Sequence, residues 1–129
     1  MNNDEVIEQL NRAIEELEKR RQEADEILDR EIKPEDFPDI EKRVIERVSS
    51  LTLRIHNLRT RRRNRELLAE LDETIKPLSK ARVEAMQEAL EKISESIAAT
   101  RNIQAALKLA ATISQSATEM FEASAPTTA

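Results

Sequence analysis

Apolar residues recur at steps of three, four and seven along the first part of the chain, which is the spacing of one face of an α-helix. These residues are Val6, Leu10, Ile14, Leu17, Ala24, Leu28 and Ile32. Asn2 can cap the start of this helix, because Glu5 follows three residues later and completes a capping-box pattern. The pattern predicts a first helix over about residues 3–33.

Two prolines, Pro34 and Pro38, interrupt this periodicity. Both cannot lie inside one helix, and each disfavours helical geometry in the residue before it. The chain is therefore predicted to turn here. Asp36 or Asp39 can cap the helix that follows.

A second apolar seam follows the prolines, and it is regular up to Leu58. Its members are Ile40, Val44, Val48, Leu51, Ile55 and Leu58. The residues from Arg59 to Glu66 include no apolar side chain, and the pattern resumes about one position out of phase at Leu67/Leu68, Leu71, Ile75 and Leu78. Two interpretations compete: a turn centred on Asn64, or one continuous helix over about residues 39–75 whose middle is bordered by charge.

The last part of the chain shows a third seam. Its members are Val83, Met86, Leu90, Ile93, Ile97, Leu107, Ala110, Ile113, Ala117 and Phe121. Pro77 fits the opening turn of a helix, where its missing N–H costs nothing, and no helix breaker follows before Phe121. We therefore expect one helix over residues 78–122 and a disordered tail over residues 123–129.

These elements predict an all-α fold, an elongated up-down-up antiparallel three-helix bundle with coiled-coil-like packing. A chain of 129 residues suits one domain, which we place at residues 1–122. The charged fraction of 36% and the absence of glycine are typical of long helices.

The composition also narrows the chemistry that the chain can perform. Phosphate-binding loops and nucleophile elbows need glycine, and thiolate nucleophiles and Cys-based zinc sites need cysteine, yet the chain contains neither residue. His56 is the only histidine, so it cannot form the paired-histidine sites of zinc or di-iron proteins. We predict no catalytic residue, no metal, no cofactor and no small-molecule substrate.

The stretch from Arg54 to Arg65 contains six arginines and no acidic residue, although the formal net charge of the chain is −5. Guanidinium groups contact phosphates well, so nucleic-acid binding is one interpretation. The acidic chain repels a polyanion, however, and there is no Tyr or Trp on which bases could stack. The candidate polyanion-binding residues, called the arginine cluster below, are Arg59, Arg61, Arg62, Arg63 and Arg65.

Structural neutralisation of the arginine cluster is the interpretation that we favour. In an antiparallel bundle with turns near residues 36 and 77, carboxylates of both neighbouring helices face the cluster. We expect these to be Glu8, Glu15 and Glu16 of the first helix and Glu88, Glu91 and Glu95 of the third. A turn at Asn64 would crowd the arginines without organised counter-charge, so neutralisation favours a continuous second helix.

The C-terminal helix carries more small and apolar side chains than one buried face needs. Between Ile97 and Met120 they cover about 240° of the helical wheel, whereas a core-facing stripe covers roughly 100°. Either alanine is tolerated on an exposed face, or a partner covers the excess. We predict a partner-binding surface, and a symmetric dimer is the commonest closed assembly. Its residues are Ala105, Leu109, Ile113 and Met120.

The predicted function is that of a non-enzymatic helical assembly or adaptor module, which binds a protein partner or a second copy through its Ala-rich C-terminal helix. The alternative is a nucleic-acid-associated protein that uses the arginine cluster. The N-terminus lacks the pattern of a signal peptide, and no apolar run reaches the roughly 20 residues that span a bilayer. We therefore expect a cytoplasmic protein without membrane contact. The partner, the process and the oligomer number stay open.

Overall fold

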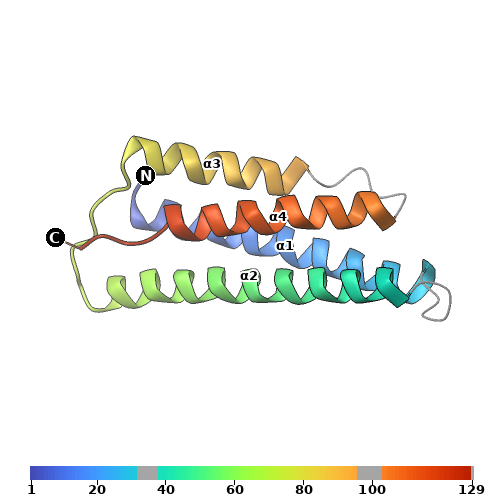
Figure 1. The fold of residues 1–129 in the computed structure, drawn as a ribbon. Helices are drawn as coiled ribbons and strands as arrows, with labels where there is room; N and C mark the ends of the chain where they lie inside the picture. Colours follow the sequence, from blue (N-terminus) through green and yellow to red (C-terminus); the bar gives the residue numbers. More distant parts are fainter. Residues whose placement is uncertain (32–37, 96–102, 129) are drawn as a thin grey trace.

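The computed structural model describes residues 1–31, 38–95 and 103–128, and within them it contains four helices (Figure 1). Their bounds are α1 Asn3–Glu31, α2 Pro38–Glu70, α3 Lys80–Glu95 and α4 Ile103–Ala123. The all-α class is thus confirmed, and the fold is a four-helix bundle.

The predicted three-helix arrangement is wrong, because the single helix expected over residues 78–122 is the pair α3 and α4, which pack against each other antiparallel. Both helices contribute to one core, for example with Met86 and Ile93 from α3 and Ala117 from α4. Two helices that bury facing stripes have the same apolar spacing as one long helix. The sequence from Glu95 to Ile103 also contains no Gly or Pro that would signal an end.

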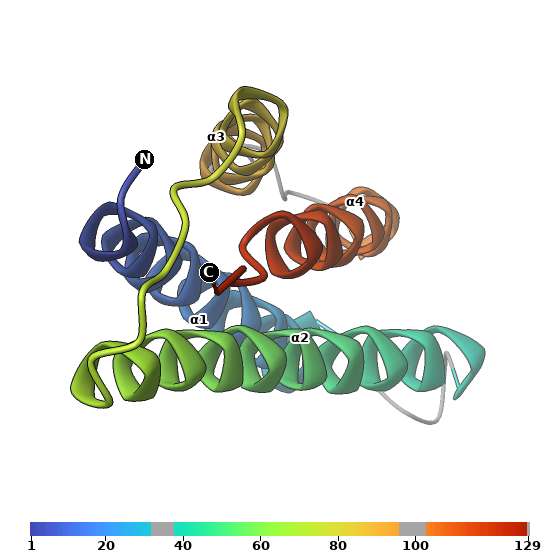
Figure 2. The same cartoon turned by 90° about the vertical axis from the view of Figure 1, so that its left-hand side faces the viewer.

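The bundle consists of two helical hairpins that lie side by side. α1 packs antiparallel to α2, and α3 packs antiparallel to α4. Ser50 contacts Ser114, and Arg65 contacts Ser124, so residue numbers rise together along α2 and α4 and these two helices run in the same direction. α1 and α3 also contact each other, so the four helices surround one core (Figure 2).

Side chains cap the N-terminal ends of α1 and α3. The Glu5 N–H donates to Asn2 Oδ1 at 2.9 Å, and the Asn2 N–H donates to Glu5 Oε1 at 3.4 Å, which confirms the predicted capping box. At the start of α3, the Arg82 N–H donates to Ser79 Oγ at 3.3 Å. This helix therefore begins after Ser79, two residues later than Pro77 suggested.

α2 ends at Glu70, earlier than the predicted residue 75. The Glu73 N–H donates to the Leu68 carbonyl and the Asp72 N–H to the Ala69 carbonyl, both at 3.1 Å, and Asp72 has a left-handed φ of 55°. This is the hydrogen-bond pattern of a Schellman motif. Glycine usually occupies its left-handed position, but the chain has no glycine, and aspartate tolerates this conformation better than most residues. The chain then crosses the bundle end toward α3 over residues 71–79, the crossover (Figure 2).

The core is apolar and draws on all four helices. Buried side chains of α1 and α2 interdigitate with those of α3 and α4, and the crossover adds Leu78. The buried hydrophobic residues are Val6, Leu10, Ala13, Ile14, Leu17, Leu51, Ile55, Leu58, Leu78, Met86, Ala89, Leu90, Ile93, Ile113, Ala117, Met120 and Ala123.

α2 is continuous through Arg59–Glu66, so the interpretation with a turn at Asn64 is wrong. The change of phase in the apolar pattern marks leucines that are exposed, and it does not mark a turn. Leu67 and Leu71, which the sequence assigned to the buried seam, are 37% and 71% exposed. The helix continues without a break, and the shifted leucines therefore point away from the core.

The continuity of α2 can be tested at Asn64, which is exposed and makes no core contact. Inside a helix, glycine is about 1 kcal/mol less favourable than alanine. We expect Asn64→Gly to have a free energy of unfolding about 1 kcal/mol lower than Asn64→Ala in urea denaturation. The same pair of substitutions at exposed Thr74, in the crossover, is the control and should differ clearly less. Equal stability of the two variants at Asn64 would contradict a continuous helix.

Candidate functional site

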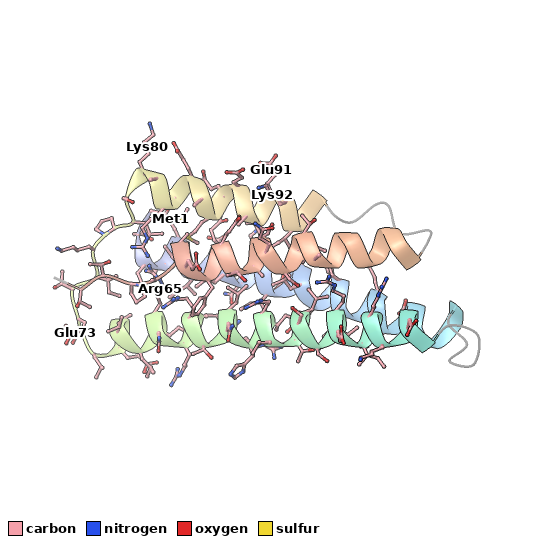
Figure 3. The ribbon with its side chains drawn as sticks, in the orientation of Figure 1. Met1, Arg65, Glu73, Lys80, Glu91 and Lys92 are labelled. Atoms are coloured by element: carbon pink, nitrogen blue, oxygen red, sulfur yellow. The ribbon has the colours of Figure 1, made fainter. Side chains whose placement is uncertain are left out.

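Arg65 is a buried cation that connects three segments at one end of the bundle (Figure 3). Its side chain is 1% exposed; Nε donates to the Ser124 carbonyl at 2.8 Å and Nη1 to Asn3 Oδ1 at 2.8 Å. The Asn3 amide returns a hydrogen bond to the Arg65 carbonyl at 3.2 Å. Burial, and then the charges of Arg82 and Arg61, lower the pKa of Arg65 to about 10. The guanidinium is therefore still charged at neutral pH.

Two further arginines bind carbonyl groups at the same end of α4. Arg82 Nε donates to the Ala123 carbonyl at 2.9 Å, and its Nη2 donates to the Ala125 carbonyl. Arg61 Nε donates to the Phe121 carbonyl at 3.2 Å, and the Arg61 guanidinium lies 4.0 Å from the centroid of the Phe121 ring. The last carbonyls of a helix lack intrahelical partners and carry partial negative charge. The arginines therefore cap α4.

The C-terminal segment, which the sequence predicted to be disordered, lies against the crossover in the structure. The Lys76 N–H donates to the Thr127 carbonyl at 2.8 Å, and Ile75 forms an isolated antiparallel bridge with Thr128. The Leu78 N–H donates to the Met1 carbonyl at 3.3 Å, so the N-terminus joins the same bundle end. Periodicity could not indicate this, because the contacts are made by backbone groups.

Two members of the arginine cluster face α1. Arg59 forms an ion pair with Glu18, and Arg62 Nη1 donates to Asn11 Oδ1 at 2.7 Å. These positions are close to those expected for antiparallel helices with a turn near residue 36. Among the described side chains, however, Glu18 is the one carboxylate of another helix within 4.0 Å of the cluster.

Glu88 and Glu91, which were predicted to neutralise the arginine cluster from the third helix, do not do so, because the end of α4 occupies that place. The side chain of Glu95 lies outside the described residues. Backbone carbonyls of α4 replace them as acceptors for Arg61 and Arg65. The exposed Arg63 instead pairs within α2, with Glu66 at 3.6 Å and Glu70 at 3.7 Å. The arginine cluster thus mainly caps the end of α4 and connects α2 to α1.

Two of the four predicted partner-binding residues are buried inside the bundle. Ile113 is 2% exposed and Met120 is 0% exposed, so both belong to the core, where α3 covers α4 after the chain reverses. Ala105 and Leu109 lie in the part of α4 whose side chains are outside the described residues. The outward-facing residues described on α4 are polar, namely Thr112, Gln115 and Glu122.

Large exposed apolar side chains are instead found on α2. Their exposed fractions are 48% for Ile45, 53% for Leu53, 37% for Leu67 and 71% for Leu71. Leu71 directly follows α2, and its N–H still donates to the Leu67 carbonyl at 3.0 Å as in a helix. At 100° per residue the four positions fall within about 80° of one another, on the side opposite the buried seam of α2. We call them the outer stripe. The phase change after Leu58 is the sequence signal for these exposed leucines. The prediction that Leu67 and Leu71 belong to the buried seam is wrong.

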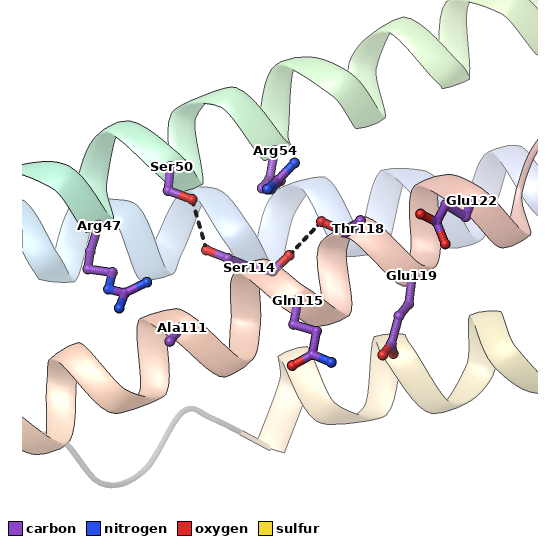
Figure 4. A pocket seen from close by; sticks show the side chains of 9 residues that line it. All are labelled: Arg47, Ser50, Arg54, Ala111, Ser114, Gln115, Thr118, Glu119 and Glu122. Carbon is purple, nitrogen blue, oxygen red and sulfur yellow. Dashed lines mark hydrogen bonds between the residues drawn. The ribbon is translucent and has the colours of Figure 1, made fainter.

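A polar groove of about 490 Å³ lies between α2 and α4 (Figure 4). Ser50 Oγ donates to Ser114 Oγ at 3.4 Å, and Thr118 Oγ1 donates to the Ser114 carbonyl at 3.1 Å. The lining residues are Arg47, Ser50, Arg54, Ala111, Ser114, Gln115, Thr118, Glu119 and Glu122.

In the described part of the chain, no group of three His, Cys, Asp or Glu side chains could hold a metal ion. The helices in that part include none with the length and apolar character needed to cross a bilayer.

No family model, curated protein or solved structure matches the chain.

The capping role of the bundle-end arginines predicts a large effect for Arg65→Met. This substitution keeps the volume but leaves the Ser124 carbonyl and Asn3 without their donors, so we expect a loss of about 2 kcal/mol in unfolding free energy. Hydrogen exchange at the Lys76 amide, which donates to Thr127, should also become faster.

Arg63→Met is the matched control, because Arg63 is exposed and its ion pairs contribute only about 0–1 kcal/mol. An Arg65→Met protein that is as stable as the control, with Lys76 protected as in the wild type, would show that Arg65 does not hold the bundle end.

Proposed function

We propose that the protein is a non-enzymatic helical assembly module, and that a second copy binds to the outer stripe of α2. The observation that carries this proposal is the alignment of four large exposed apolar side chains on one helix face. Burying apolar surface is favourable by roughly 25 cal/mol per Å², and exposed apolar patches mark interaction sites more often than isolated residues do. The non-enzymatic part rests on composition, since the chain lacks cysteine and glycine and has one histidine.

The dimensions of the outer stripe suit a helix-to-helix contact. From Ile45 to Leu71 it extends about 39 Å at 1.5 Å per residue. Between the apolar positions it carries exposed Ser49, His56 and Thr60, which are small or can form hydrogen bonds at the edge of an interface. Such a contact is long and narrow, as in a helical pair.

A symmetric arrangement makes the outer stripe complementary to itself. If a second copy of α2 lies antiparallel about a twofold axis level with Leu58, Ile45 of each copy lies level with Leu71 of the other. Arg63 lies on the same face as Ile45, and Arg59 lies beside the stripe. Both charges are paired, because Arg59 pairs with Glu18 of α1 and Arg63 with Glu66 and Glu70 of α2.

The other candidate surfaces have less support. Two residues of the predicted C-terminal-helix surface, Ile113 and Met120, are in the core, and the side chains of Ala105 and Leu109 lie outside the described residues. A nucleic-acid interface would need free guanidinium groups, whereas Arg61 and Arg65 donate to carbonyls of the α4 end.

The proposal predicts that Leu53→Gln combined with Leu71→Gln reduces self-association without lowering stability, because both side chains are exposed in the monomer. Sedimentation velocity over a wide concentration range should show a dimer for the wild type and a monomer for the double variant. Ala81→Gln changes an exposed small apolar residue of α3 and serves as the control, which should dimerise normally.

Two results would contradict the proposal. One is a wild-type chain that stays monomeric at every concentration. The other is a double variant that dimerises as strongly as the wild type, which would place the contact elsewhere.

A further inference from the structure

The groove between α2 and α4 is polar at a place where packed helices usually present apolar side chains. On α2, Arg47, Ser50 and Arg54 follow one another at steps of three and four, so they share a face. On α4, the facing side chains include Ser114 and Thr118. The hydroxyl groups make only the contacts given above, and the Ser50–Ser114 distance of 3.4 Å is long for two hydroxyls.

The charged side chains of this groove lack partners. Arg54 Nε is buried and has no hydrogen-bond partner. Within the described residues, neither Arg47 nor Arg54 has a carboxylate within 4.0 Å, and neither Glu119 nor Glu122 has a basic group at that distance. A buried polar atom without a partner is unfavourable, and in folded proteins water, an ion or a ligand usually satisfies it.

The charges are separated along the groove. Because Ser50 is level with Ser114 and Arg61 with Phe121, Arg54 is level with about Thr118. Glu119 is the next residue, and Glu122 lies about one helical turn beyond Arg54. Figure 4 shows the arginines on α2 and the glutamates on the final turns of α4. We call Arg47 and Arg54 the arginine end of the groove, and Glu119 and Glu122 its glutamate end.

We propose that this groove binds a small zwitterionic ligand, with its anionic group at the arginine end and its ammonium group at the glutamate end. The anionic group is a carboxylate or a phosphate, since both accept paired hydrogen bonds from a guanidinium. The hydroxyls of Ser50, Ser114 and Thr118 line the space between the two ends. The glutamates favour a cation and repel a second anionic group, so the site selects against polyanions. This site does not involve the outer stripe.

The test is an NMR titration of the isotope-labelled full chain, in which the Arg54 Nε–H resonance is followed. The probes are ε-aminohexanoate, which joins a carboxylate to an ammonium group, and phosphoethanolamine, which joins a phosphate to one. Hexanoate and hexylamine each carry a single charge. We expect saturable shifts with at least one zwitterion, and binding about tenfold weaker for hexanoate and hexylamine. The comparison of the two zwitterions decides between carboxylate and phosphate.

Variants test whether the named side chains form the site. Arg54→Gln should weaken zwitterion binding about tenfold, read from the Ser114 and Thr118 amide shifts, and Arg54→Lys should retain part of it. Glu122→Gln should weaken binding of the zwitterion but not of hexanoate. Arg43→Gln makes the same charge change at an exposed position of α2 outside the groove and should bind as the wild type does.

Thermal unfolding of each variant, followed by circular dichroism, separates loss of binding from loss of the fold. The proposal is overturned if no probe gives a saturable shift, if hexanoate binds as tightly as the zwitterions, or if folded Arg54→Gln binds as the wild type does.

Discussion

The structure depends on the way in which a buried guanidinium is held without a carboxylate: two nitrogens of Arg65 have acceptors, whereas its Nη2 is buried without one. Arg65 donates to the Ser124 carbonyl and to Asn3, and the negative end of the α4 dipole supports its charge. Hydrogen bonds of charged groups contribute about 1.5–3 kcal/mol each, whereas exposed ion pairs contribute about 0–1 kcal/mol. The alignment of α1, α2 and α4 therefore depends more on this bundle end than on the ion pairs along the helix surfaces.

This capping arrangement also decides which surfaces remain for binding. Because Arg61 and Arg65 donate to carbonyls of the α4 end, α4 runs parallel to α2 with its last turn beside the arginine cluster. Along the same pair of helices, Ser50 then faces Ser114, and the polar groove opens between them. Within the described residues no helix lies against the opposite side of α2, which exposes the outer stripe.

The sequence predicted the features that depend on local chemistry. The capping box at Asn2 follows from residue types three apart. The sequence favours a continuous α2 past Asn64 over a turn but leaves both open, and the third-helix carboxylates behind that preference are replaced by carbonyls of α4. The change from three helices to four could not be predicted, because the apolar spacing of α3 and α4 continues as in one helix and no Gly or Pro separates them.

The acceptors of the arginine cluster were missed for a related reason. A sequence shows which side chains carry negative charge, and glutamates stand at suitable positions on the expected third helix. These glutamates were therefore the predicted partners of the arginines. Every residue has a backbone carbonyl, so the sequence does not indicate which carbonyls accept hydrogen bonds from arginines. The contacts of Arg61 with Phe121 and of Arg65 with Ser124 could therefore not be predicted. The same contacts explain why a tail composed of small and polar residues lies in a defined place.

The two proposed binding surfaces are geometrically independent although both use α2. On the helical wheel, Arg47, Ser50 and Arg54 lie roughly 130° from the centre of the outer stripe. A second copy that covers the stripe therefore leaves the groove of each copy open, and a ligand in the groove leaves the stripe exposed. Binding at one site could change the affinity of the other only by altering an element that both sites use, and that element is α2. Because α2 is one continuous helix anchored at Arg65, it can transmit a shift or rotation along its length, but the two sites do not compete for the same atoms.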